Sequence, residues 1–255
     1  MNIKEILGGA KKEEEQKTPV SPFTSPKEKV LTEGEFSTKR HLGGGINKTE
    51  FVEIKDDGSG VLKETYEDYA KRERAVCLID RFLGFNFVPP TVLKGGKVLQ
   101  EFIKNAETAD TYEGRVKREG MPPILKSELL RLHLFDAIIG SYDRHKNNYL
   151  VSGQKIFAID NERSLDKNEK AHRSSSESCL SMVVELIAGG EKIPQDVVVG
   201  LKNFSSSKEN QKLLKILLEE LLESGIVSRF MKRLLNLIDA ITEDGSLDGP
   251  KVLNL

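Results

Sequence analysis

The sequence of 255 residues is nearly balanced in charge, with 39 Lys and Arg against 40 Asp and Glu, and it is 38% hydrophobic. This composition is typical of a globular protein of one domain or two joined lobes, and the charge balance argues against a dedicated nucleic-acid binder, which usually has a basic excess. The two cysteines form no CxxC pair, and neither a membrane-length apolar run nor a signal-peptide core is found, so we expect a cytoplasmic protein without stable membrane insertion.

Residues 1–38 are predicted to form a disordered arm. From about residue 9 onward this segment is poor in apolar residues and rich in Lys, Glu, Pro, Ser and Thr. It cannot bury enough surface to offset the conformational entropy lost on ordering. Its Ser and Thr residues beside prolines are candidate phosphorylation sites, and a solvated linker is the alternative interpretation.

Residues 39–104 have the pattern of a small β-rich lobe with one helix. Two apolar runs, near Thr49–Ile54 and Val61–Lys63, flank a DDGSG turn, which predicts a hairpin. The FNFVPPTVL and KVLQEFI runs, separated by KGG, predict two further short strands. Between the hairpin and these strands, the apolar residues have helical spacing, which predicts a helix that ends at a C-cap, Gly84. One face of this helix is formed by Ala75, Leu78, Ile79 and Phe82.

Residues 105–255 are predicted to be mainly helical. A long amphipathic helix ends near Gly140, a short apolar hairpin follows, and three further helices come after it. We interpret the Leu-rich stripes of the last two helices as core. The fold class expected for the whole chain is α+β, with a small β-rich N-lobe and a mainly helical C-lobe.

The hairpin brings together residue types that bind metal. Its strands, within NYLV and KIFAID, are joined by SGQ, and antiparallel pairing places Asn148, just before the first strand, beside Asp160 at the end of the second. An amide oxygen and a carboxylate suit Mg²⁺, which binds few protein groups together with phosphate oxygens. Asp143 lies five residues before Asn148, in the turn after the long helix, and can face the same point.

This arrangement is typical of phosphoryl transfer from ATP. Asp143 would orient the attacking hydroxyl or accept its proton, while Asn148 and Asp160 hold Mg²⁺ on the nucleotide phosphates. The order of Asp, four residues, Asn, a hairpin and a final Asp matches the catalytic loop and metal-binding Asp of protein kinases.

A lysine and a glutamate of the first lobe are candidates for holding the nucleotide. Lys63 ends the second strand, from which it can reach phosphates, and Lys55 is the competing lysine. Glu73 on the next helix can pair with Lys63 and hold it in place, with Glu67 as the alternative.

Two backbone segments are further candidates for nucleotide binding. A glycine run ahead of a strand can approach phosphates through its amides, with a flexible turn as the alternative; it consists of Gly43, Gly44 and Gly45. The segment joining the lobes can bind an adenine edge, with an ordinary strand end as the alternative; it consists of Gln100, Glu101, Phe102 and Ile103.

Charged and polar residues around the hairpin leave alternatives open. Arg144 and Lys146 either neutralise phosphate charge or are solvated, and His145 is expected to order the turn rather than to bind metal. The segment from Glu169 to Ser181 lies where kinases have an activation or substrate-recognition segment, and a polar surface loop is the alternative.

The chain resembles the phosphatidylinositol 3/4-kinase-like branch of the protein-kinase fold over roughly residues 41–165. Type II phosphatidylinositol 4-kinases have a segment from the phosphate-binding lysine to a VP.T strand that is similar to GVLKE…RERAVCLIDRFLGFNFVPPTVL in this chain. Their catalytic hairpin resembles IIGSYDRHKNNYLV…FAIDNE. HipA-like kinases share a similar catalytic turn. The resemblance implies a phosphate contact for Lys63, positioning by Glu73, a catalytic Asp143, and Mg²⁺ ligands Asn148 and Asp160.

We therefore expect an α+β, two-lobed protein-kinase-like fold. The expected activity is that of an ATP- and Mg²⁺-dependent phosphotransferase that moves the γ-phosphate to a hydroxyl, with a protein Ser or Thr favoured. The lack of Trp and of a palmitoylation-type cysteine cluster departs from the pattern of lipid kinases. Asn161 follows Asp160 where ordinary protein kinases have the Phe of Asp-Phe-Gly. The alternatives are a phosphoinositide-type lipid kinase, transfer of AMP to protein, and a non-catalytic nucleotide-binding pseudokinase. Expected partners are a nucleotide and a protein acceptor, including the chain itself by autophosphorylation.

Overall fold

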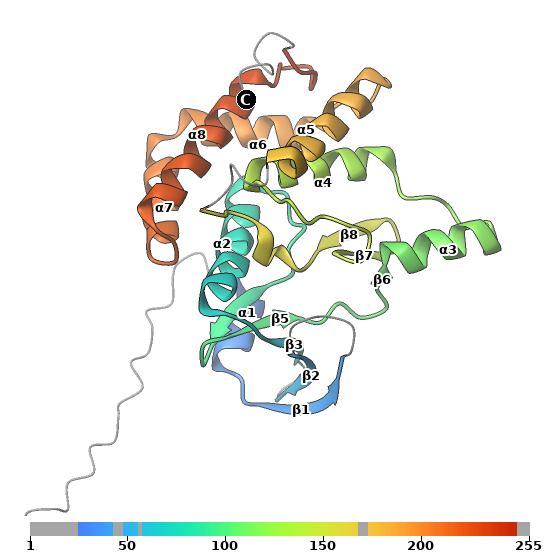
Figure 1. The fold of residues 1–255 in the computed structure, drawn as a ribbon, viewed down its shortest axis with the longest axis vertical. Helices are drawn as coiled ribbons and strands as arrows, with labels where there is room; N and C mark the ends of the chain where they lie inside the picture. The colour runs from blue at the N-terminus through green and yellow to red at the C-terminus, as the bar shows by residue number, and fades with distance from the viewer. Residues whose placement is uncertain (1–24, 43–47, 56–57, 168–172, 249–255) are drawn as a thin grey trace, which may run out of the picture.

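The computed structural model describes residues 25–42, 48–55, 58–167 and 173–248. Within these ranges the chain forms a β-rich N-terminal part followed by a helical C-terminal part, as Figure 1 shows. The arrangement confirms the α+β architecture expected from the sequence. The expected division between residues 104 and 105 remains a prediction.

A five-stranded antiparallel sheet forms most of the N-terminal part, in the order β1-β2-β3-β5-β4. The predicted hairpin is confirmed as β2 and β3, where Thr49 pairs with Lys63. The two strands predicted around KGG are β4 and β5. The strands are β1 (Phe36–His41), β2 (Lys48–Ile54), β3 (Gly58–Glu64), β4 (Thr91–Lys94) and β5 (Lys97–Glu101).

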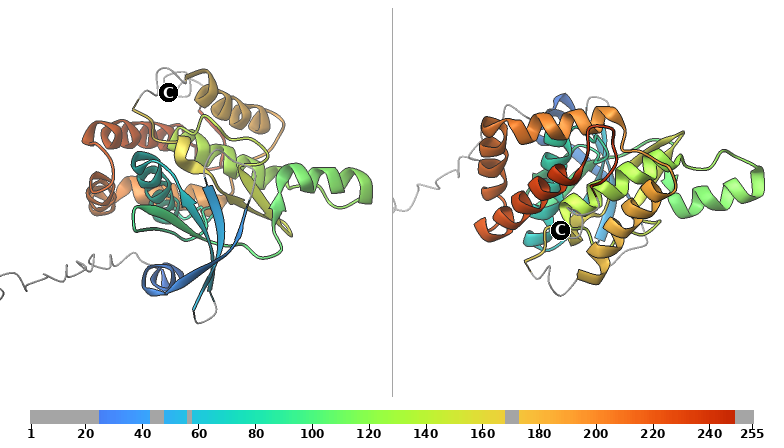
Figure 2. Two further views of the ribbon diagram at one scale, coloured as in Figure 1. Left: turned by 60° about the horizontal axis from the view of Figure 1, so that its bottom comes forward. Right: turned by 90° about the horizontal axis from the view of Figure 1, so that it is seen from above.

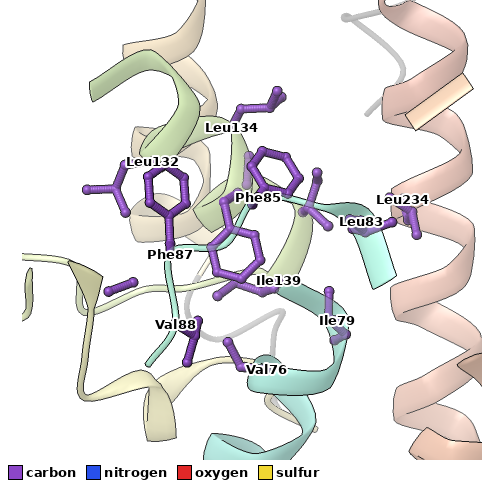
Figure 3. Close-up of a cluster of buried hydrophobic side chains, with 14 of the residues drawn as sticks. Val76, Ile79, Leu83, Phe85, Phe87, Val88, Leu132, Leu134, Ile139 and Leu234 are labelled. Carbon is purple, nitrogen blue, oxygen red and sulfur yellow. The ribbon is translucent and has the colours of Figure 1, made fainter. Parts of the chain in front are cut away.

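Helix α2 (Glu67–Leu83) connects the sheet to the C-terminal part. It packs against β4 and β5 on one side, and it ends at Gly84, whose φ of 76° matches the predicted C-cap. Its buried residues join a core shared with the C-terminal helices, and Figure 3 shows Val76 of α2 in the same cluster as Ile139 and Leu234. Packing on both sides therefore holds α2 in place.

The segment expected to be disordered is ordered from Ser25 onward, where it forms α1 (Pro26–Glu33) and β1. Ser25 and Glu28 form a capping box, in which each side chain accepts the backbone N–H of the other. Leu31 is buried in the small core of the sheet. The prediction of disorder was wrong here because it weighed average composition, whereas one capping box and two buried side chains order this helix. Residues 1–24 lie outside the described residues.

Helix α4 (Lys126–Ile139) lies at the centre of the C-terminal part and ends at Gly140, as predicted. The hairpin after it is confirmed as β7 and β8, and β6 extends these to a three-stranded sheet. The remaining elements are β6 (Glu107–Thr108), α3 (Ala109–Glu119), β7 (Tyr149–Ser152), β8 (Lys155–Ala158), the 3₁₀ helix η2 (Asn161–Arg163), α5 (Arg173–Ala188), α6 (Gln195–Ser206), α7 (Lys208–Glu219) and α8 (Ser224–Ala240).

Besides α1, two helices and one boundary differ from the sequence prediction. The prediction did not include α3 or α6, and α3 projects from the rest of the molecule in Figures 1 and 2. The segment from Glu169 to Ser181 is helical from Arg173 onward, because α5 begins earlier than its apolar residues indicate. None of the helices in the described ranges has the length and apolarity needed to cross a membrane.

The segment between α2 and β4 is held by a buried carboxylate. The sequence predicted one strand over FNFVPPTVL, but only its end forms β4. Asp80 of α2 accepts the backbone N–H of Phe87 at 2.9 Å and of Val88 at 3.1 Å. Because these amides bond to a side chain rather than to a strand, the segment leaves the sheet and places Phe85 and Phe87 in the core of Figure 3.

Asp80 should make the stability of the fold depend on pH. Burial raises the pKa of Asp80 from 3.8 to about 7, although the two N–H donors act in the opposite direction. The folded chain then binds more protons than the unfolded chain between these values, so the free energy of unfolding should fall as pH rises from about 4 to about 7. In Asp80→Asn this fall should be smaller, by on the order of 2–4 kcal/mol. Chemical denaturation across this pH range measures the difference, and identical slopes would contradict the assignment.

Candidate active site

Lys63 is the centre of the candidate site because it joins three elements that are distant in sequence. Its Nζ donates to Glu73 Oε1 at 2.9 Å and to Asp160 Oδ1 at 3.0 Å. Lys63 lies on β3, Glu73 on α2, and Asp160 just after β8. Lys63 is 8% exposed and Glu73 is completely buried. The structure thus brings together three of the residues singled out from the sequence.

The surroundings of Lys63 keep its side chain charged. Burial on its own would lower the pKa of Lys63, but the carboxylates of Glu73 and Asp160 outweigh it and raise this pKa above its usual range. The result is a fixed ammonium ion at the junction of the two parts of the molecule. A group of this kind can bind phosphate oxygens.

The two residues weighed as alternatives lie outside this cluster. Lys55 Nζ is 3.8 Å from Glu35, and both side chains are exposed. Glu67 pairs with Lys71 at 2.6 Å on the first turn of α2, also at the surface. Lys55 and Glu67 therefore pair with surface residues and not with the Lys63 cluster.

Asp160 has a left-handed backbone, with φ 57° and ψ 50°. This conformation costs a residue other than glycine roughly 1–2 kcal/mol, and such strain is concentrated at functional sites. It allows the chain to leave β8 at Ala158 and to start η2 at Asn161. The Asp160 side chain is 42% exposed, so its carboxylate is in contact with both Lys63 and solvent.

Asn148 lies beside Asp160 at the other end of the hairpin, as predicted. The Ile159 N–H donates to the Asn148 carbonyl oxygen at 3.1 Å, which extends the β7–β8 pairing to these residues. The Asn148 side chain donates through Nδ2 to the carbonyl oxygen of Asp143 at 2.7 Å. This bond orients the amide so that its other atom, Oδ1, can bind a cation. The donor set fits a hard divalent cation.

Glu162 is an acidic residue of the site that sequence reasoning missed. Oxygen atoms of Glu73, Asp160 and Glu162 all lie within 4.8 Å of one another. Burial raises the pKa of Glu162, and Thr65 Oγ1 donates to its Oε2 at 3.2 Å. The available signal was its position two residues after Asp160, since the tight turn of η2 returns the side chain toward the same point.

Asp143 is accessible from solvent. Its side chain is 41% exposed, and its Oδ2 lies 3.6 Å from Nε of Arg163, which is exposed to a similar degree. Arg163 ends η2 and was not singled out from the sequence. It places a cation next to the proposed catalytic carboxylate.

Arg144 has neither of the roles weighed for it from the sequence. Its side chain is 2% exposed and forms a buried ion pair with Asp136 of α4. Its Nε lies 3.0 Å from both Asp136 oxygens. The same guanidinium donates to the carbonyl oxygens of Asn148 and Ile159, and to Asn161 Oδ1 at 2.6 Å. It thereby connects the turn, both ends of the hairpin and α4.

The neighbours of Arg144 in the turn are exposed. Lys146 pairs with Glu113 of α3 at the surface. His145 accepts the N–H of Asn147 through Nδ1 at 3.3 Å, a contact that orders the turn as the sequence suggested.

The segment proposed to bind adenine is already partly hydrogen bonded. Gln100 is buried, and its side chain donates to Thr91 Oγ1 at 2.9 Å. The Glu101 N–H donates to the Pro90 carbonyl oxygen at 2.8 Å and the Phe102 N–H to that of Ser59 at 3.0 Å. These two amides are therefore engaged within the protein, and β5 is paired with both β3 and β4 at Gln100. Gly43, Gly44 and Gly45 lie outside the described residues.

The arrangement combines the groups that phosphoryl transfer requires. A buried ammonium ion, a cluster of oxygen ligands and an accessible carboxylate come together where the hairpin meets β3 and α2. Catalysis in this class of reaction depends on positioning and charge neutralisation.

Solved structures of kinases resemble this chain, whereas no protein-family model matches it and no curated protein matches it in sequence. The crystal structure of the Golgi casein kinase with Mn/ADP bound matches with a TM-score of 0.57 and 13% identity, over 84% of this chain and 74% of that one. The Helicobacter pylori proinflammatory kinase CtkA matches with 0.51 and 14%, over 88% and 98%. Hydra Fam20 with sugar matches with 0.53 and 15%, over 83% and 86%.

These likenesses confirm the expected protein-kinase-like fold, with its β-sheet N-terminal part and helical C-terminal part. Their identities of 13 to 15% restrict the conclusion to the fold. The resemblance to the phosphatidylinositol 3/4-kinase-like branch is not among these matches, and it remains a prediction.

The ion pair between Arg144 and Asp136 should be strongly coupled. Removing one partner leaves a buried charge without a counter-charge, so Arg144→Met should lower the free energy of unfolding by about 3–5 kcal/mol. Arg144→Met combined with Asp136→Leu should lose clearly less than the sum of the two single variants. Urea denaturation of the four proteins gives the coupling, and additive losses would contradict the pair.

Proposed function

We propose that this chain is an ATP- and divalent-metal-dependent phosphotransferase that transfers the γ-phosphate of ATP to a hydroxyl group. The observation that carries the proposal is the Lys63 ammonium held between Glu73 and Asp160, at 2.9 and 3.0 Å. The first contact joins β3 to α2, and the second joins β3 to the end of the β7–β8 hairpin. Neither the sheet nor the helix requires these contacts for its own formation. A phosphate-binding lysine explains why the chain assembles them here.

A lysine and a set of oxygen ligands would hold the nucleotide and its cation. Lys63 binds phosphate oxygens, and Glu73 holds the lysine in the required position. Asn148, through Oδ1, and Asp160 are the proposed ligands of a divalent cation, with Glu162 close enough to assist. When bound, Mg²⁺ or Mn²⁺ neutralises negative charge on the phosphate oxygens. The Golgi casein kinase, which is similar in fold, was crystallised with Mn and ADP bound, and this supports a nucleotide with a divalent cation.

Asp143 is the proposed catalytic carboxylate. Its exposed side chain can accept a hydrogen bond from the substrate hydroxyl and orient the oxygen for in-line attack. As the hydroxyl oxygen bonds to the γ-phosphorus, the bond from that phosphorus to the β–γ bridging oxygen breaks, ADP leaves with that oxygen, and the hydroxyl proton moves to Asp143. Arg163 lies close enough to Asp143 to bind the transferred phosphoryl oxygens.

The proposed acceptor is a Ser or Thr hydroxyl of a protein. Two of the solved structures similar in fold are a casein kinase and a proinflammatory kinase, and the first name refers to a protein substrate. The chain itself is a second protein acceptor to be tested, since it has Ser and Thr residues in the segment that precedes α1.

The proposal predicts metal-dependent transfer of phosphate that needs Asp160. The full chain, alone and with dephosphorylated casein, is incubated with ATP and Mg²⁺ or Mn²⁺, and intact masses are recorded. The wild type should add the mass of one phosphate per site. Asp160→Asn should lower the rate by about 100-fold or more while remaining folded. The matched control Asp196→Asn, at an exposed carboxylate of α6, should leave the rate unchanged.

Other masses would lead to other conclusions. Addition of AMP would identify a nucleotidyl transferase that uses the same groups. Transfer to phosphatidylinositol but to neither protein would identify a lipid kinase. ATP binding without turnover on any of these acceptors would favour a nucleotide-binding module.

A further inference from the structure

Glu28 of α1 is a buried charge that the proposed chemistry does not use. Its side chain is completely buried, although most of α1 is polar and exposed. A buried carboxylate is costly unless charged and polar partners surround it. The partners of Glu28 therefore indicate why it is buried.

The partners of the Glu28 carboxylate in the described part of the chain lie on α2 or at the start of α1. Nη1 of Arg74 and Nη1 of Arg81 each donate to one of its oxygens. The Ser25 N–H donates to Oε2 at 2.8 Å, and the Cys77 thiol lies 3.8 Å from Oε1. The arginine side chains are only 13% and 19% exposed. One carboxylate thus pairs with two largely buried cations of α2.

The spacing of the two arginines fixes α2 in two respects. Arg74 and Arg81 are seven residues, or about two turns, apart, so they lie on the same face of the helix. Contacts at two points along one face restrict both rotation about the helix axis and movement along it. Arg74 also donates to the Thr91 carbonyl oxygen of β4 at 2.6 Å, which ties the same face to the sheet.

The residue next to Arg74 is Glu73, which holds Lys63. Successive residues of a helix point about 100° apart, so Glu73 faces the site while Arg74 faces α1. A rotation of α2 that displaced Arg74 would displace the Glu73 carboxylate with it. The 2.9 Å contact between Glu73 and Lys63 therefore depends on the rotational setting of this helix.

Helix α1 is itself anchored to the sheet. Leu31 is 3% exposed and packs in the core of the sheet with Leu62, the residue before Lys63. Lys27 pairs with Glu101 of β5, and Lys94 of β4 donates to the Leu31 carbonyl oxygen at 3.3 Å. Helix α1, drawn in blue at the edge of the sheet in Figure 2, is therefore fixed to the strand that carries the lysine and to the helix that carries its partner.

We propose that Glu28 is a positioning residue for the pair formed by Lys63 and Glu73, acting through Arg74 and Arg81. Its link to catalysis depends on the proposed function, whereas its effect on the geometry of the pair does not. The N-terminal segment would then be part of the nucleotide site's framework.

The direct test measures the reactivity of Lys63 toward an acylating reagent. Full-chain Glu28→Gln keeps the size of the side chain but removes its charge, and Glu33→Gln changes an exposed residue of the same helix. Labelling of each lysine is followed by mass spectrometry well below the melting temperature. In Glu28→Gln the labelling rate of Lys63 should rise about fivefold or more relative to exposed Lys55, and in Glu33→Gln it should not change.

Controls separate local from global effects. Cys179 is buried in the C-terminal part, and its alkylation rate should not rise if only α2 has moved. If Glu28→Gln does not fold, Glu28→Asp replaces it, because it keeps the charge and shortens the side chain by one methylene. An unchanged Lys63 rate in the folded variant would overturn the proposal, as would equal increases at Lys63 and Cys179.

A second measurement connects Glu28 to the nucleotide. The affinity of Glu28→Gln for ATP should fall about tenfold, while its affinity for adenosine stays within about twofold, because Lys63 contacts phosphates and not the base. Equal losses for both ligands would mean a general structural effect and would overturn the proposal. If the wild type binds neither ligand, the proposed function fails, and the Lys63 labelling still decides the role of Glu28.

Discussion

The ammonium of Lys63, shared by Glu73 and Asp160, is the interaction on which the organisation of this protein depends. It is the point at which β3, α2 and the β7–β8 hairpin meet. An ammonium ion that is nearly buried requires carboxylates, and a completely buried Glu73 requires a cation. Each element therefore has to be in position before the charge of the others is compensated. The strained backbone of Asp160 and the double-sided packing of α2 both support this single contact.

Other buried charge pairs in the described part of the chain join separate elements of the fold. Arg144 joins α4 to the turn before the hairpin, 8 residues later, and Glu28 joins α1 to the more distant α2. Arg72 of α2 pairs at 3.0 Å with Asp166, which follows η2. Desolvation makes such pairs poor sources of stability, but a charge left without its partner is strongly unfavourable. They therefore act mainly by excluding alternative arrangements of helices that hydrophobic packing alone would tolerate.

The sequence predicted those features that depend on local pattern. The β2–β3 and β7–β8 hairpins, the caps at Gly84 and Gly140, and the approach of Asn148 to Asp160 follow from periodicity and turn chemistry. It failed where a residue's partner is far away. Nothing around Glu28 indicates that its counter-charges lie 46 and 53 residues later. Arg144 is a different case, because Asp136 lies only 8 residues earlier but sits on an otherwise apolar face of a helix. Composition alone made the segment around α1 look unable to fold.

The long separation between Glu28 and its arginines also has a consequence for how the protein forms during synthesis. The ribosome releases α1 well before Arg81, so the Glu28 carboxylate stays hydrated until the end of α2 has emerged. Lys63 meets Glu73 only 10 residues later in the chain, but Asp160 follows 97 residues after Lys63. Contacts of such separation close late, because the entropy of a long loop must be lost first. A nascent chain would therefore pair Glu28 with its arginines first and complete its charged centre last, after the β7–β8 hairpin has been synthesised.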